Sequence, residues 1–323
     1  LDELIDGGYD IEECQRLVAA FTADGTLDYF SFDVGGNWDA PSYIPIPWYD
    51  DAQWAEMCGQ AKQATHLPVV YAGRVTSVEQ AEAVLAAGHA DVIAMARASM
   101  ADPALVDKAR GLITEPVRPC IGLNECIHRK LIDGLKYACG VSTTFAREHE
   151  LGGRPTRTSS PRSIVVVGGG PGGTEFAALC AEQGHTVQLW ERGDAIGGAI
   201  AVAALARGNH TYRRWIDWQA ARLARVGVEV HLGRNATADD VIAAAADVVL
   251  VATGATPRIP PIAGVDAPHV CTAAAALRDG HTLGHRVAVL QGAIDDARRH
   301  AILPVLRHEV EQHGVLAACD EAL

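Results

Sequence analysis

Three glycines and one acidic residue carry the clearest chemical pattern in the sequence. Gly168, Gly170 and Gly173 follow an apolar run, and Glu191 ends the next apolar run. In a dinucleotide-binding βαβ unit, the first glycine permits a tight turn, the second lets the backbone approach a pyrophosphate, and the third allows helix and strand to pack closely. The acidic residue accepts hydrogen bonds from the adenosine ribose. The pattern predicts a dinucleotide site, and a structural glycine turn without a ligand is the alternative.

Three of the eight cysteines lie together in a segment without helical or strand periodicity. They are Cys120, Cys126 and Cys139. Thiolates at short spacing on a loop suit an iron–sulfur cluster, which needs soft ligands that converge. Zinc with His128 as a fourth ligand is one alternative, and three unligated thiols are the other.

Two arginines follow consecutive predicted strands in the first half of the chain. Gly73 and Arg74 come after one apolar run, and Ala96 and Arg97 end the next. In eight-stranded α/β barrels, the loops after the last two strands commonly bind a phosphate through backbone N–H groups and a basic side chain. Arginine offers a permanent charge and a planar fork of donors. The pattern predicts a phosphate site, with surface arginines in loops as the alternative.

The elements that must position these residues alternate along both halves of the chain. In the first half we expect strands over 28–34, 67–72 and 90–96, and helices over 11–23, 51–64, 77–87 and 103–110. In the second half we expect strands over 163–167, 186–190, 228–232 and 248–251, and helices over 174–183 and 212–226. A strand that alternates with a helix implies parallel strands and an α/β fold.

The predicted organisation has three parts. Residues 1–115 are expected to be the C-terminal part of a TIM (β/α)8 barrel, because three parallel strands alone make no stable sheet and about five further strands would precede them. A small complete α/β domain is the alternative. Residues 116–161 form a cysteine-containing linker, and 162–323 an incomplete, Rossmann-like FAD or dinucleotide-binding domain. A second nucleotide domain should begin at 286–291, but no glycine fingerprint follows it.

Composition excludes two classes of partner. The net charge of −13 and a pI near 5.4 argue against nucleic acid and against an anionic membrane surface, since either needs a concentrated basic patch. The longest apolar run, Val241 to Ala255, is interrupted by Asp247 and is too short to span a bilayer. No signal-peptide pattern opens the chain, so we expect a cytoplasmic protein with a small-molecule substrate.

Taken together, these motifs resemble the old yellow enzyme family in its large, multi-cofactor form, close to trimethylamine dehydrogenase and dienoyl-CoA reductase. The resemblance rests on the runs Ala72-Gly73-Arg74, 96–103, 118–122 and 167–171, in unbroken order. It implies an FMN-bearing barrel, a [4Fe-4S] cluster and a domain that holds FAD or only ADP, with NAD(P)H as a further cofactor. It also implies that the chain is truncated at both ends.

The resemblance assigns roles to particular residues. Gly73, Arg74, Ala96 and Arg97 would contact the phosphate end of FMN, and Cys120, Cys126 and Cys139 would ligate the cluster. Two short runs resemble segments that lie against FAD in flavoprotein disulfide reductases; they contain Gly198 and Gly254. Leu123 stands where the family has a second cysteine. The cluster would then keep a non-cysteine ligand, hold three irons, be labile, or be lost.

Two residues bear on the substrate. Trp38 matches an aromatic residue that lines the amine pocket of related dehydrogenases, where a cation–π contact would hold an ammonium group. A packed loop aromatic is the alternative. Lys130 stands at the position of a second pocket tryptophan and would repel an ammonium. No catalytic acid or base can be named from the sequence.

The function expected from the resemblance is a flavin-dependent oxidoreductase. It would move hydride between an amine or an enone or enoyl-CoA substrate and FMN, and electrons through the cluster to FAD and NAD(P)H. A non-catalytic or split-subunit fragment that only binds nucleotide is the alternative, and a stand-alone FAD reductase from Ser163 onward is a third hypothesis. A homo-oligomer, or a partner chain that supplies the missing strands, is the expected assembly.

Overall fold

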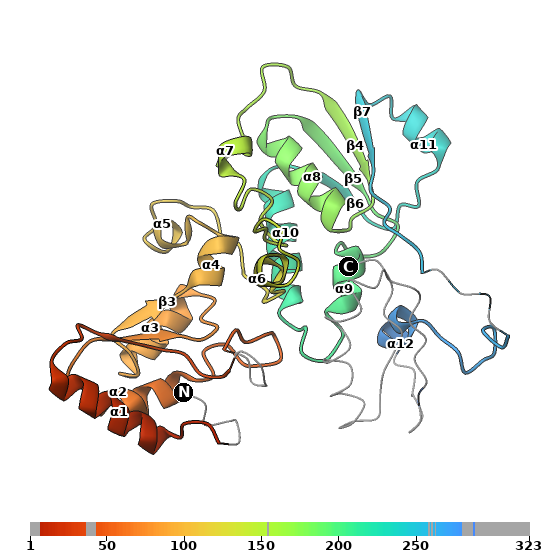
Figure 1. Cartoon of the computed structure of the whole chain (residues 1–323). Coiled ribbons are helices and arrows are strands. Elements are labelled where there is room, and N and C mark those ends of the chain that lie inside the picture. Colours follow the sequence, from red (N-terminus) through yellow and green to blue (C-terminus); the bar gives the residue numbers. More distant parts are fainter. Residues whose placement is uncertain are drawn as a thin grey trace. The chain divides into compact units, whose positions relative to one another are not determined.

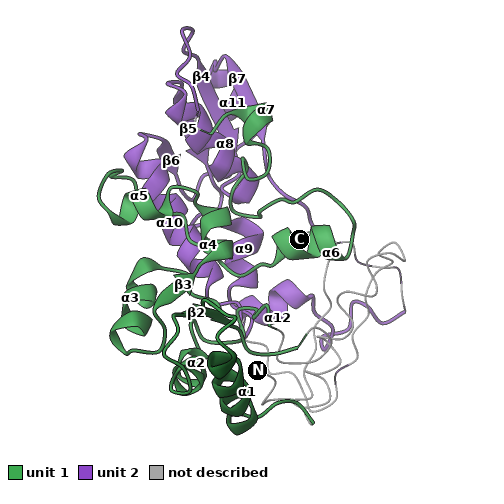
Figure 2. Cartoon of the chain, turned by 60° about the vertical axis from the view of Figure 1, so that its left-hand side comes forward, with its two compact units in different colours: residues 1–154 green, residues 155–323 purple. Residues whose placement is uncertain are grey.

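The computed structural model of the chain describes residues 7–36, 43–153, 155–257, 259, 261, 263–279 and 287. Two compact units divide the chain between Arg154 and Pro155, shown in green and purple in Figure 2. We call residues 1–154 unit 1 and residues 155–323 unit 2. The division falls inside the predicted linker. Trp38 and the segment 288–323 lie outside the described residues.

Unit 1 contains a three-stranded parallel sheet in the order β1-β2-β3. Its strands are β1 (Phe30–Phe32), β2 (Val69–Ala72) and β3 (Val92–Ala94). Its helices are α1 (Ile11–Asp24), α2 (Ala55–Lys62), α3 (Val78–Ala86), α4 (Ala96–Ala101), α5 (Leu105–Ala109), α6 (Glu125–Leu131) and α7 (Glu148–Leu151) (Figure 1). The predicted alternation of helices and parallel strands is confirmed, although each strand is shorter than expected.

Local capping explains where the longer helices of unit 1 begin. The side chain of Asp10 accepts a hydrogen bond from the Glu13 amide at 2.7 Å before α1, and Gly25 ends that helix with a φ of 69°. Ser77 and Gln80 form a reciprocal capping box at the start of α3. Alternate residues of β2 pack into the core, which also holds Trp54, Cys58 and Val84.

One expectation about unit 1 is wrong, and one feature of it was not predicted. Strand β3 ends at Ala94 and α4 begins at Ala96, so Arg97 lies in the first turn of a helix and not at the end of a strand. The Ser99 amide donates to the Met95 carbonyl at 3.0 Å, which draws the backbone out of the strand there. The predicted linker contains α6 and α7, helices of seven and four residues that are too short for periodicity to reveal.

Unit 2 contains a four-stranded parallel sheet in the order β6-β5-β4-β7. Its strands are β4 (Ser163–Val167), β5 (Thr186–Trp190), β6 (Glu229–His231) and β7 (Val248–Val251). Its helices are α8 (Pro171–Glu182), α9 (Gly198–Ala203), α10 (Tyr212–Arg225), α11 (Ala238–Ala243) and α12 (Ala273–Asp279) (Figure 1). The bounds of β4, β5 and β7 match the predicted runs, and α8 begins three residues earlier than expected because proline is favoured at a first helical position.

The core of unit 2 lies between the sheet and two helices. Ile164 and Val166 of β4 pack with Ala177 and Ala178 of α8, all of them almost completely buried, and Leu223 of α10 joins them. Small side chains on α8 let this helix approach the sheet closely. The glycine turn therefore sits at the junction of a rigid strand and a rigid helix.

A buried ionic network joins α8 to α10. The Arg222 guanidinium is within 2.6 Å of Glu175 Oε2 and 2.8 Å of Glu182 Oε1, and its side chain is almost fully buried. Burial alone lowers the pKa of Arg222, but hydrogen bonds and charges from Glu182 and Glu175 outweigh that effect and raise it. The network fixes the helix that carries the turn.

Candidate cofactor sites

Glycine is required for backbone packing at the first and third glycine positions of the turn after β4. Gly168 has a φ of 113°, and a Cβ there would collide with the carbonyl oxygen of Ala252. A Cβ on Gly173 would collide with the carbonyl oxygen of Gly168, so α8 could not seat against the turn. Any side chain at either position would push the helix and the β4–β7 pair apart.

The second position differs, because the space beside it is open. A Cβ on Gly170 or on Gly172 would meet no atom of the described chain within 4 Å. Gly170 is the N-cap of the twelve-residue helix α8, whose first amides have no partner within the helix. Open space in front of free helical amides is what a pyrophosphate needs to approach the backbone.

The carboxylate of Glu191 closes the turn from the end of β5. Its Oε2 accepts from the Gly169 amide at 2.6 Å, and its Oε1 accepts from the Gly193 amide at 2.7 Å. An ionised carboxylate has about four acceptor positions, so two remain after these bonds. Glu191 can thus hold the turn and still accept from a ribose hydroxyl.

Of the other two glycines predicted to lie near a flavin, Gly198 lies against this turn and Gly254 follows a residue that contacts it. A Cβ on Gly198 would come 3.0 Å from the Cα of Gly170, and the Gly197 amide donates to the Gly169 carbonyl at 2.8 Å. The Ala252 amide donates to the Val167 carbonyl at 2.8 Å, which brings the run that contains Gly254 to the end of β4. Thus Gly168, Gly170, Gly173, Glu191 and Gly198 meet at one edge of the sheet, with Gly254 two residues beyond Ala252.

Gly73 and Arg74 follow β2 in a tightly held loop of unit 1. The Tyr71 hydroxyl donates to the Gly73 carbonyl at 3.0 Å. The Arg74 side chain is 2% exposed and forms an ion pair with Asp51, with 2.9 Å between Nε and Oδ1. Arg74 has a φ of 54°, which is strained for a long side chain, and a Cβ on Gly122 would lie 2.6 Å from its Nη1. Its guanidinium is enclosed by protein.

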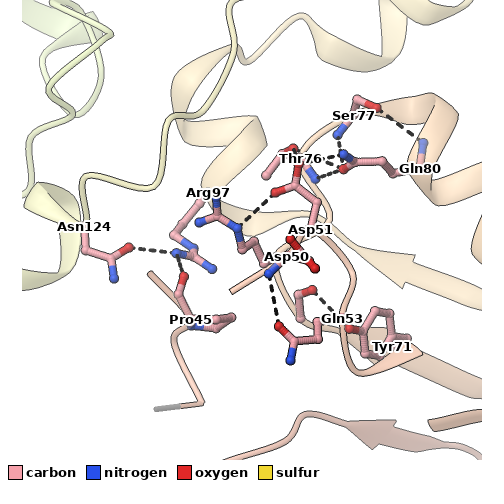
Figure 3. A network of polar contacts seen from close by, with 12 residues as sticks. Pro45, Asp50, Asp51, Gln53, Tyr71, Thr76, Ser77, Gln80, Arg97 and Asn124 are labelled. Carbon is pink, nitrogen blue, oxygen red and sulfur yellow. Dashed lines mark hydrogen bonds and ion pairs between the residues drawn. The ribbon is translucent and has the colours of Figure 1, made fainter. Parts of the chain in front are cut away.

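Arg97 follows β3 and carries a different set of contacts. Its Nη1 donates to the Pro45 carbonyl at 2.8 Å and to Asn124 Oδ1 at 2.7 Å (Figure 3). Burial lowers the pKa of Arg97, whereas the nearby thiols of Cys120 and Cys126 and the Asp51 carboxylate oppose that shift. Ala96, the first residue of α4, lies next to it and is exposed.

The three clustered cysteines influence one another electrostatically. Burial raises the pKa of the Cys126 thiol, and the neighbouring thiols of Cys139 and Cys120 raise it further. Burial likewise raises the pKa of Cys139, against hydrogen bonds from the amides of Val141 and Ser142. Cys126 is buried and the other two are partly buried.

The cysteine segment does not present a four-thiolate cluster site. Within the described ranges, no group of three or more His, Cys, Asp or Glu side chains is arranged to hold a metal ion. The side chain of Leu123 occupies the space where a Cβ on Gly140 would lie, so an isobutyl group stands beside the cysteines. The three cysteines therefore do not supply the four thiolates of the [4Fe-4S] cluster that the resemblance implies.

Comparison with known proteins finds similarity along most of the chain. Residues 166–230 match the family model of an NAD(P)-binding Rossmann-like domain, which covers the glycine turn and Glu191. The chain is 33% identical to N,N-dimethylglycine/sarcosine dehydrogenase of Chromohalobacter salexigens over 79% of its length, and 32% identical to dimethylamine dehydrogenase of Hyphomicrobium sp. over 82%. The solved structure of 2-naphthoyl-CoA reductase with 2-naphthoyl-CoA superposes on 90% of the chain with a TM-score of 0.80 and 28% identity.

The chain belongs to the old yellow enzyme family, in its trimethylamine dehydrogenase-like form. It spans about two fifths of the length of the curated relatives it matches, 38% and 39% of the two named above. It covers 44% of the 2-naphthoyl-CoA reductase chain. The regions matched by these relatives include residues of both units, because they cover most of the chain.

Two residues that contact Arg74 and Arg97 could not be predicted from the sequence. Asp51 lies before α2 and Asn124 lies in the cysteine segment, far from either arginine along the chain. No local pattern marks them, because each acts through a contact that forms only in the folded chain. The residue type of Asn124 gives one hint, since asparagine adopts a positive φ more often than most residues do. Asn124 has such a φ in the structure.

Proposed function

We propose that this chain is part of a flavin-dependent oxidoreductase in which unit 2 binds the ADP portion of FAD, or ADP itself. The observation that carries the proposal is the turn, where Gly170 faces open space at the first turn of α8 and Glu191 keeps acceptor capacity. The α8 amides would hold the pyrophosphate, and Glu191 would accept from the ribose. Gly198 would lie along the nucleotide, and Gly254 would lie near the end of β7.

We further propose that unit 1 is a segment of a (β/α)8 barrel that holds the phosphate end of FMN. Gly73, Arg74, Ala96 and Arg97 follow adjacent parallel strands, so they share one edge of the sheet. Bound FMN would supply the hydride and single-electron chemistry. The residues of this chain would bind and orient its phosphate, and the packed loop around Arg74 would exclude water from that end.

The substrate of the complete protein is proposed to be an amine or an enone or enoyl thioester. The relatives include a dimethylamine dehydrogenase and a cinnamate reductase, both of which match most of this chain. NAD(P)H is the proposed electron partner, in keeping with the family model that matches unit 2.

A second function is favoured by the cysteine segment. Leu123 stands among the thiols, and the described residues present no metal site, so a chain that only binds nucleotide is the alternative. Such a protein would hold FAD or ADP and transfer no electrons.

Cofactor extraction distinguishes these functions. The purified chain is denatured, and its released flavins and nucleotides are separated by chromatography, alongside iron and sulfide analysis. The oxidoreductase proposal expects FMN together with FAD or ADP. A chain with ADP or FAD but no FMN supports the nucleotide-binding alternative, and a colourless chain without ADP contradicts both.

A further inference from the structure

Both hydrogen bonds that the structure assigns to the Arg97 guanidinium end on neutral acceptors. The Pro45 carbonyl accepts at 2.8 Å and the Asn124 amide oxygen at 2.7 Å (Figure 3). Neutral acceptors orient a guanidinium without cancelling its charge, whereas a carboxylate at the same distance would do both. Arg97 is therefore held in place while it keeps a net positive charge.

The Arg74 guanidinium is held in the opposite way. Asp51 forms an ion pair with it at 2.9 Å, and both side chains are buried, so the pair is close to neutral as a unit. Asp51 Oδ2 also accepts from Gln80 at 2.8 Å and from Thr76 at 3.3 Å, which ties the pair to the start of α3 (Figure 3). This arrangement suits a structural clamp of the loop after β2 better than a donor of charge.

Asn124 is suited to its contact by both its side chain and its backbone. It precedes α6 with a φ of 58° and a ψ of 12°, and its side chain does not cap that helix. Instead Oδ1 accepts from Arg97, and Nδ2 donates to the Ile44 carbonyl at 3.4 Å. An amide can accept on one side and donate on the other, and a carboxylate cannot.

We propose that Asn124 is a positioning residue that orients Arg97 and preserves its charge, so that Arg97 rather than Arg74 supplies the positive charge that binds the flavin phosphate. The inference rests on the proposed FMN site. It ties the cysteine segment to phosphate recognition through one side-chain hydrogen bond, independently of any metal. A carboxylate at position 124 would pair with the Arg97 guanidinium and leave little net attraction for a phosphate.

The test uses FMN titrations monitored by flavin fluorescence, with riboflavin as a probe that lacks the phosphate. Asn124→Asp conserves shape and tolerates a positive φ, yet places a carboxylate beside Arg97. Asn124→Gly removes the contact without backbone strain. Gln63→Glu adds the same charge on the exposed end of α2, before β2 begins, and serves as the matched control.

We expect Asn124→Asp to weaken FMN binding by about tenfold or more and to flatten its dependence on salt, because one charge pair with the phosphate is lost. Riboflavin binding should change little. Asn124→Gly should have a smaller effect than Asn124→Asp, since Arg97 loses orientation but keeps its charge. Gln63→Glu should bind FMN like the unmodified chain.

Other outcomes overturn the inference. Equal FMN affinity in Asn124→Asp and the unmodified chain would show that Arg97 does not carry phosphate binding. Equal losses for FMN and riboflavin would show a general structural role for Asn124. If the unmodified chain binds no FMN, the proposed FMN site itself fails and the inference fails with it, whereas FMN binding by the unmodified chain keeps the two questions separate.

Discussion

At the residue scale, the cysteine segment departs most from its resemblance to the family. Leu123 is 44% exposed, lies beside Gly140, and is followed three residues later by the buried Cys126. A leucine offers no lone pair to a metal, and its branched side chain fills space beside the cysteines. Burial raises the pKa of the Cys126 and Cys139 thiols, so both can remain protonated at neutral pH.

Restoring the missing thiol should change how much iron the chain retains. After anaerobic reconstitution with iron and sulfide, we expect Leu123→Cys to hold more iron and sulfide per chain than the unmodified protein, because a fourth thiolate completes the ligand set. Leu131→Cys, at a more exposed leucine of the same segment, is the matched control and should hold no more than the unmodified chain. Equal iron content in all three proteins would show that Leu123 does not limit the cluster.

Each glycine of the dinucleotide fingerprint could be predicted from the sequence, because these residues act through the geometry of the backbone. A turn that excludes Cβ at Gly168 and Gly173 depends on local geometry, which glycine spacing reports directly. The contacts of Glu191 with two backbone amides could not be predicted in the same way, since they depend on how the loop that contains Gly193 folds back toward β5. Asp51 and Asn124 were missed for the same reason.

At the element scale, apolar runs predicted β4, β5 and β7 of unit 2 to the residue. Buried parallel strands consist of continuous apolar residues that polar loops bound, as in β4. The expectation that β7 is also buried is wrong, because Val249 and Val251 are exposed. The strands of unit 1 were predicted too long, because the apolar runs continue past the residues that pair in the sheet. The boundary at Ala94 could not be located, because alanine and methionine favour a helix as readily as a short strand.

The junction of α8 with α10 should depend on Arg222. Arg222→Met keeps the apolar stem but leaves Glu175 and Glu182 without their buried partner, so we expect unfolding free energy to fall by about 3 kcal/mol. Arg213→Met on the same helix is the matched control, because its pair with Asp217 is exposed and 3.7 Å long. Chemical denaturation of both variants checks this, and similar losses would contradict a role for the buried network.

The core of unit 1 should be sensitive to alkaline pH through one helix residue. Burial raises the pKa of Cys58 on α2 from 9.0 to about 12. The unfolded chain loses this proton first, so the stability that the protonated thiol contributes is complete below about pH 9 and is lost as the pH rises toward about 12. The fall is about 1.4 kcal/mol per pH unit for one group.

Cys58→Ala should remove that part of the pH dependence. The cavity that the substitution leaves lowers the free energy of unfolding at every pH. The difference in this free energy between Cys58→Ala and the unmodified chain should nevertheless narrow between pH 9 and 11. Cys271→Ala, at an exposed thiol, should leave the pH profile unchanged. Parallel profiles for Cys58→Ala and the unmodified chain would show that the thiol ionises freely in the folded state.

At the scale of the whole molecule, the chain joins two α/β units of different design. One contains a three-stranded sheet with an arginine after each of two strands, and the other contains a four-stranded sheet with the glycine turn. None of the described helices is long and apolar enough to cross a membrane. The sequence predicted both units but located their boundary only within the linker 116–161. The two helices in that segment, α6 and α7, are too short to show as periodic patterns that would narrow the boundary.

The two cofactor sites should respond independently, since each is built from residues of one unit. A substitution in the glycine turn should therefore lower FAD retention and leave FMN retention unchanged when both flavins are quantified on the same chain. Loss of both flavins from a variant that stays folded would show that the sites are not separate.

The most direct test of the central claim is FAD titration of Gly170→Ala. A methyl group at this position meets no atom of the described chain, so the fold and its melting temperature should be preserved, while the pyrophosphate seat is filled. Gly153→Ala, which also adds a methyl in open space, is the matched control. We expect at least tenfold weaker FAD binding in Gly170→Ala alone, because the close approach of the phosphate to the backbone is lost. Unchanged FAD affinity in a folded Gly170→Ala protein would contradict a pyrophosphate site at this turn.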